Sequence, residues 1–149
     1  MTVGAVIIGP DGRAKAYRPL PDADRAAALR AGLAAFGRGD FFEAHELLEP
    51  AWMGTNVPAE RALLQGLIKV AAAYVHAARG NPVGISRNLQ GARLRLVEAQ
   101  EGYRTAGLSD PTWLDIEALV GAIDVRLADL ATHAGGPTLG PPELPGSVP

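Results

Sequence analysis

The chain contains no cysteine, which excludes disulfides, iron–sulfur ligation and catalytic thiols. A metal site would therefore have to use carboxylates and the three histidines. No apolar run approaches the roughly 20 residues that a transmembrane helix needs. The N-terminus also lacks the basic region of a secretory signal. We therefore expect a cytoplasmic protein with no membrane partner.

Positive charge is not in excess either. Fourteen basic residues face sixteen acidic ones, and the formal net charge of −2 argues against nucleic acid as the main partner. Aromatic residues make up only 5% of the chain, whereas hydrophobic residues in total reach 48%. A length of 149 residues and this composition are typical of one domain with an ordinary core.

Three regions differ in their local pattern. Residues 1–21 carry two short β-favouring runs on either side of "GPDG", which predicts a short β-hairpin or an extended arm. Residues 22–133 repeat apolar side chains with helical spacing and form the predicted bundle domain. Residues 134–149 are rich in glycine and proline, which predicts an extended tail that is ordered only where it packs on a neighbour.

Within 22–133, breaks such as "GRGD", "GTNVP", "RGNP" and "AGLSDP" separate five amphipathic segments. Short connections between such segments predict an all-α five-helix bundle. The first helix is expected over residues 22–36. The others are expected to start after Asp40, at Pro58, at Pro82 and at Pro111.

Three of these starts carry a capping signal. Asp40 is the expected N-cap of the second helix, with Glu43 completing a capping box. Asn81 before a proline, and Asp110 before a proline, are the expected N-caps of the last two helices.

The segment "FFEAHELLEPAW" concentrates His45, Glu46 and Glu49 in a His-Glu-x-x-Glu motif. His45 and Glu49 are four residues apart and share one helix face. The motif departs from the zinc-protease pattern, because Glu49 stands where that pattern requires a second histidine. The di-iron bundle pattern requires Glu-x-x-His on two helices, and this chain has none.

A looser site would use the third helix. If that helix packs antiparallel to the second, His76 could join His45, Glu46 and Glu49 around Zn, Mn or Fe. His45 and Glu49 could alternatively act as acid and base without metal. The polar stripe of the third helix comprises Arg61, Gln65, Lys69, Ala72 and His76, and we expect Gln65, with Trp52, to orient the site residues.

A structural interpretation competes with this site, and we favour it. Glu43 is accounted for by capping, and His45 and Glu49 by a helical i, i+4 pair. Gln65 and His76 could fix the register of the bundle by hydrogen bonds, with no cofactor bound.

The segments "FFEAHELLEPAW" and "RALLQGLIKVAAAYVHAARGNPVGISRNLQGARLRL" resemble the family catalogued as domain of unknown function 309. Its members are small helical proteins of bacteria and archaea. The resemblance covers residues 36–100, and more loosely extends to 130. It implies a helical bundle and leaves the function unassigned. Pro50 departs from the family pattern, and a proline there is expected to kink or end the second helix near Glu49.

Charge is unevenly distributed over the last two helices. The segment around the fourth helix is basic, and the segment around the fifth is acidic. We interpret these charges as complementary surfaces between helices or subunits, because the aromatic residues typical of a nucleic-acid groove are scarce. The basic residues are Arg79, Arg87, Arg93, Arg95 and Arg104, and the acidic ones are Asp110, Asp115, Glu117, Asp124 and Asp129.

Three functions therefore remain open. The first is a structural or interaction module that self-associates, with a homodimer favoured. The second is a metal-dependent or acid–base hydrolase-like site built from the motif of the second helix and Gln65 and His76 of the third. The third is weak nucleic-acid or anion binding through the arginines of the fourth helix. Whether the protein is an enzyme stays undecided by the sequence.

Overall fold

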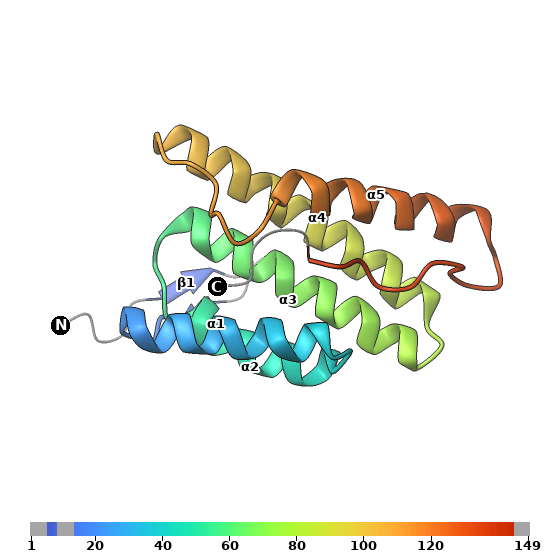
Figure 1. Ribbon diagram of the computed structural model, residues 1–149, viewed down its shortest axis with the longest axis horizontal. Coiled ribbons are helices and arrows are strands. Elements are labelled where there is room, and N and C mark those ends of the chain that lie inside the picture. The colour runs from blue at the N-terminus through green and yellow to red at the C-terminus, as the bar shows by residue number, and fades with distance from the viewer. Residues whose placement is uncertain (1–5, 9–13, 145–149) are drawn as a thin grey trace.

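The computed structural model describes residues 6–8 and 14–144, and the side chains from Tyr17 to Leu144 (Figure 1). This part of the chain is all-helical apart from two three-residue strands, which confirms the predicted fold class. The elements are β1 (Val6–Ile8), β2 (Ala14–Ala16), α1 (Asp22–Gly37), α2 (Phe41–Met53), α3 (Pro58–Ala78), α4 (Pro82–Thr105) and α5 (Ile116–Thr132).

The two strands pair antiparallel, with Ile7 opposite Lys15. The turn predicted at "GPDG" falls in residues 9–13, which lie outside the described residues. The chain after β2 is tied to the end of α2, because the Arg18 N–H donates to the Met53 carbonyl (3.1 Å) and the Leu20 N–H to the Gly54 carbonyl (3.2 Å). These bonds satisfy carbonyls that a helix end leaves without a partner.

The helices pack in the order of the chain, each against the next, and α3 lies in the middle (Figure 1). The pair α1 and α2 lies on one side of α3, and the pair α4 and α5 on the other. A helix covered from two sides needs apolar residues around most of its circumference, and α3 provides them. Its buried side chains include Leu63, Leu64, Leu67, Ile68, Val70 and Tyr74.

The local signals for helix ends succeeded in part. Asn81 caps α4 as predicted, because its Oδ1 accepts from the Gly84 N–H (3.1 Å). The predicted capping box of α2 is wrong. The Asp40 carboxylate accepts from Arg38 Nε instead of from a backbone N–H of the helix. Glu43 likewise meets Arg38 (3.4 Å) at the surface.

The predicted start of the fifth helix at Asp110 and Pro111 is also wrong. Helix α5 begins at Ile116, and Asp115 is its cap, with its carboxylate accepting from the Ala118 N–H (3.0 Å). Both aspartates fit the N-cap preference, so local chemistry could not choose between them. The later start leaves a turn before the helix that buries Leu114 against the core.

Pro50 does not end α2, which continues to Met53. That half of the prediction is wrong. Pro50 is on the exposed side of the helix, where water can satisfy the carbonyl that its missing N–H leaves without a donor. The last turn therefore forms, and it buries Trp52 to 7% exposure.

After α5 the chain reverses at Gly136, whose φ of 118° favours glycine. Residues 137–144, called the tail here, then run back beside α5 (Figure 1). Leu144 packs against the main core, and residues 145–149 lie outside the described part. None of the helices in the described part is long and apolar enough to cross a membrane.

Candidate functional site

The α2 motif is held in place by a close approach of α1. A Cβ atom at Gly32 would lie 2.6 Å from both Cγ and Cδ2 of Leu48, so the two helices meet where α1 has no side chain. Leu48, Ala44 and Ala51 are buried, and they direct the apolar side of α2 into the core. The polar residues of the motif are thereby turned toward the edge and the outside of the bundle.

His45 is about two-thirds buried, with its side chain 32% exposed. Its Nδ1 lies 3.4 Å from Oε1 of the neighbouring Glu46, which itself is 57% exposed. Glu46 and Glu49 line a surface cavity of about 390 Å³ together with Arg18, Pro50 and Met53. The two carboxylates therefore share an outward hollow beside the segment that follows β2.

His76 lies on another side of the bundle. Its ring packs directly on Gly84 of α4, where a Cβ would come within 2.5 Å of His76 Cγ. Asn81 Nδ2 also donates to His76 Nδ1 (3.2 Å). The same pattern recurs further along the seam, because Lys69 lies over Gly91 of α4. The polar stripe of α3 thus packs in part against glycines of α4.

The register of α2 on α3 separates the two histidines further. The helices run antiparallel, with Phe41 beside Tyr74 (ring centroids 5.6 Å apart) and Trp52 beside Arg61. This pairing puts His45 level with about position 69 of α3. His76 lies about seven residues further on, which is about 10 Å along the helix axis.

The structure thus brings His45 close to Glu46 and places Glu46 and Glu49 at the same cavity. His76 is not brought to these residues, because it packs against α4. Within residues 6–8 and 14–144, no group of three or more His, Asp or Glu side chains could hold a metal ion. Gln65 is half-buried on α3. The arrangement provides a histidine–carboxylate pair at the edge of α2 and a separate histidine bound to the cap of α4.

Trp52 has a structural partner that the sequence did not indicate. The Arg61 guanidinium lies 5.0 Å from the centre of the Trp52 ring, and it donates to the carbonyls of Trp52 (2.8 Å) and Thr55 (3.1 Å). Burial lowers the pKa of Arg61. A cation at these carbonyls complements the negative end of the α2 dipole and closes the α2–α3 turn.

Three of the four arginines of α4 are engaged with acidic side chains. Arg93 joins α4 to α5 through Asp124 (Nε–Oδ1, 2.6 Å). Arg95 pairs with Glu98 (2.6 Å), and Arg104 with Glu101, on the same helix. Part of the predicted complementarity of the two helices therefore operates inside one chain. An exposed arginine stripe for phosphates gains no support from these pairs.

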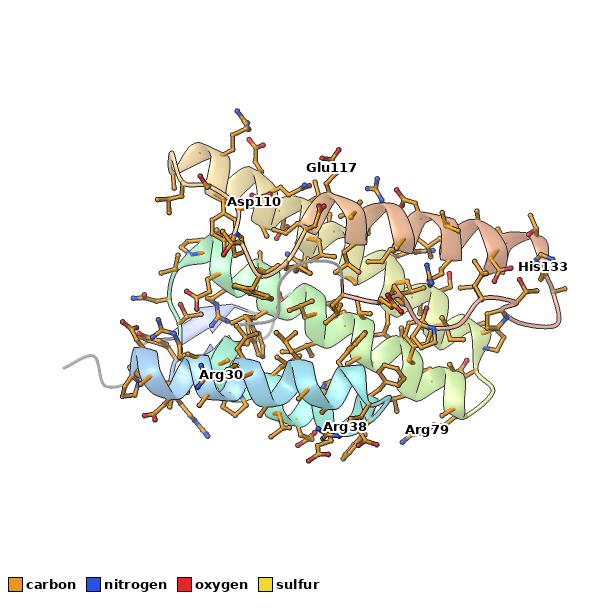
Figure 2. All side chains as sticks on the ribbon, in the orientation of Figure 1. Arg30, Arg38, Arg79, Asp110, Glu117 and His133 are labelled. Carbon is orange, nitrogen blue, oxygen red and sulfur yellow. The ribbon has the colours of Figure 1, made fainter. Side chains whose placement is uncertain are left out.

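A polar cluster that the sequence did not indicate lies on α5. Arg126 and Asp129, three residues apart on one face, both bind the backbone of the tail. His133 closes the group, with its Nδ1 3.1 Å from Asp129 Oδ1. Figure 2 shows His133 at the end of α5 from which the tail turns back. The only sequence signal was an i, i+3 polar pair, which is common on solvated helix faces.

A cavity of about 400 Å³ lies beside the far end of the tail. Three aromatic residues line it: Phe36 from α1, Phe41 from α2 and Trp113 from the turn before α5. Phe36 and Phe41 make an edge-to-face contact with ring centroids 5.1 Å apart. This hollow, lined by three aromatic side chains, therefore lies away from the His-Glu-x-x-Glu motif.

Comparison with known families identifies a match to part of the chain. The model of the family described as "Domain of unknown function (DUF309)" matches residues 29–88, which confirms the resemblance seen in the sequence. These residues span the end of α1, all of α2 and α3, and the start of α4. Comparisons with curated proteins and with solved structures found no match.

Proposed function

We propose that this protein, whose residues 29–88 match the DUF309 family, is a self-associating helical module. Two copies would pack through the outer face of α4 and α5. The outer face comprises Leu94, Val97, Ala118, Gly121, Val125 and Ala128. The observation that carries the proposal is the exposure of an uncharged stripe of small and apolar residues from Ala118 to Ala128 of α5.

The α5 part of the outer face has the spacing of a helix–helix contact. Ala118, Gly121, Val125 and Ala128 recur every three or four residues on the side opposite the core, and all four are exposed. Val125 is 56% exposed, and nothing lies within 4 Å of the place where a Gly121 Cβ would sit. Small residues at this spacing allow another helix to approach closely.

The α4 part extends the same surface. Leu94 and Val97 are 54% and 39% exposed on the solvent side of α4. The ion pair of Arg93 with Asp124 holds α4 and α5 together next to these residues. Apolar side chains exposed on two adjoining helices are typical of an interaction surface.

Charge favours a second copy as the occupant. Helix α4 carries four arginines against two glutamates, and α5 carries three acidic residues against one arginine. A two-fold axis running along the helices would put α5 of one copy on α4 of the other, so opposite charges would face each other. The alternative axis would put α5 on α5 and bring like charges together.

Sedimentation equilibrium of the full chain tests the proposal. We expect a dimer for the wild type, and at least a tenfold weaker dimer for Val125→Lys, because the ammonium would be trapped in an apolar contact. Phe42→Lys is the matched control, since Phe42 is 64% exposed on α2, on the other side of α3.

A monomer at high concentration would contradict self-association. A dimer that is weakened by Phe42→Lys and unchanged by Val125→Lys would contradict the outer face as its interface. The metal-dependent alternative gains no support from the geometry, because His76 faces α4 and not His45.

A further inference from the structure

We propose that the surface holding the tail is a binding site for an extended, proline-containing peptide segment of a partner protein. In this structure the chain's own tail occupies the site. The site, called the tail groove here, consists of Arg126 and Asp129 on α5 and the aromatic cavity of Phe36, Phe41 and Trp113. This inference does not depend on self-association, because the tail groove and the outer face use different residues.

The polar half of the tail groove recognises backbone. Asp129 Oδ2 accepts from the N–H groups of Thr138 (2.8 Å) and Leu139 (3.1 Å). Arg126 Nε donates to the carbonyl of Gly140 (2.8 Å). One carboxylate and one guanidinium thus bind three consecutive residues through groups that nearly every peptide has. Such bonds supply affinity without depending on the peptide's side chains.

Asp129 combines low exposure with several hydrogen bonds to the tail. Its side chain is only 7% exposed, and a carboxylate withdrawn from water is costly unless hydrogen bonds compensate it. The Thr138 hydroxyl donates to Asp129 Oδ1 and gives the site one side-chain contact. The hydrogen bonds from Thr138 hold the pKa of Asp129 below its ordinary value. The carboxylate therefore stays charged at neutral pH and binds its donors at full strength.

The apolar half of the tail groove recognises the proline region. Pro142 is buried and Leu144 is half-buried, and both line the aromatic cavity. Proline-rich segments are pre-formed in an extended conformation, and aromatic grooves are the surfaces that usually receive them. About 400 Å³ beside these residues is left unfilled, so a larger apolar side chain than Leu144 would fit.

The attached tail would act as a competitor. A segment tethered next to its own site has an effective concentration of the order of millimolar. A partner peptide would therefore bind the wild type with reduced apparent affinity, because only the fraction of molecules with a free groove accepts it. The preferred partner segment has Thr or Ser at its start, a small residue two positions on, and prolines before a large apolar residue.

Fluorescence anisotropy of a labelled peptide with the sequence of residues 134–149 tests the proposal. The receptor is the full chain carrying Thr138→Ala, Pro142→Gly and Leu144→Ser, which weaken the tail and leave the tail groove intact. We expect this variant to bind the peptide at least tenfold more tightly than the wild type does. Adding Asp129→Asn should abolish that binding. A peptide with the same three tail substitutions should not bind.

Hydrogen exchange of the wild type gives a second readout that involves no substitution. Excess peptide should displace the tail and speed exchange at the N–H groups of Thr138 and Leu139, which are the two that Asp129 accepts. The proposal is overturned if saturating peptide changes neither this exchange nor the anisotropy. It is also overturned if the peptide binds equally well with Asp129→Asn.

Discussion

Gly32→Ala should destabilise the protein, although alanine is the better helix former. Gly32 lies inside α1, where replacing glycine by alanine would by itself stabilise the helix by about 1 kcal/mol. The new methyl group, however, would lie 2.6 Å from Cγ and Cδ2 of Leu48. Carbon atoms in good contact are about 3.5–4.0 Å apart, so α1 and α2 would have to separate by about 1 Å.

The size of the stability change depends on whether Leu48 can move away from the new methyl group. Leu48 is 1% exposed and cannot turn into solvent. Overpacking of this kind typically costs about 1–3 kcal/mol. After the gain in helix propensity of about 1 kcal/mol, we expect the free energy of unfolding to fall by up to about 2 kcal/mol. Shortening the neighbour should relieve the clash, so Leu48→Ala should cost less in the Gly32→Ala background than the roughly 2–5 kcal/mol expected alone.

Urea unfolding followed by circular dichroism measures these changes. The matched control is Gly121→Ala, which is inside α5 with nothing within 4 Å of the new methyl group. It should stabilise the protein by about 0.5–1 kcal/mol. All variants would carry Val125→Lys, so that self-association does not contribute. If Gly32→Ala stabilised the protein as much as Gly121→Ala, the close approach of α1 and α2 would be refuted.

Two further predictions concern a cap and a titration. Asp115→Ala should lower the free energy of unfolding by about 1 kcal/mol, because the Asp115 carboxylate caps α5. Asp40→Ala should cost only a few tenths of a kcal/mol, because the Asp40 side chain makes no capping hydrogen bond. Equal losses in urea unfolding would contradict the different roles of the two residues. Burial, and then the charges of Glu60 and Asp110, raise the pKa of Tyr103 to about 12. Stability from Tyr103 should therefore be fully present below pH 10 and be lost as the pH rises through 12, by about 1–2 kcal/mol after allowance for solvent screening. Tyr103→Phe should reduce this alkaline loss in urea titrations between pH 9 and 12, and an unchanged loss would count against the assignment.

Helix number and most helix starts followed from the sequence because they depend on neighbours along the chain. The apolar period marked five segments, and Asn81 caps α4 through a residue only three positions away. The start of α5 did not follow, since Asp110 and Asp115 carry equivalent local signals. Burial of Leu114 against the core distinguishes them, and that burial is a tertiary contact.

The candidate site likewise has a part that the sequence predicted and a part that depends on tertiary contacts. Spacing correctly put His45 and Glu49 on neighbouring turns of one helix, but spacing says nothing about which helix a side chain meets. His76 turns to Gly84 because the missing side chain there leaves room for an imidazole. Gly84 is visible in the sequence, but only the packing of α3 on α4 makes it the neighbour of His76.

By itself, then, the sequence determined the all-α class, the five helical segments and the resemblance to the DUF309 family. These features rest on periodicity and on caps, which act within a few residues. Tertiary structure alone decided that Arg61 covers Trp52, that the two histidines lie apart, and that Arg126 and Asp129 bind the tail. Each of these depends on the register and rotation of one element against another, which many distant contacts set together.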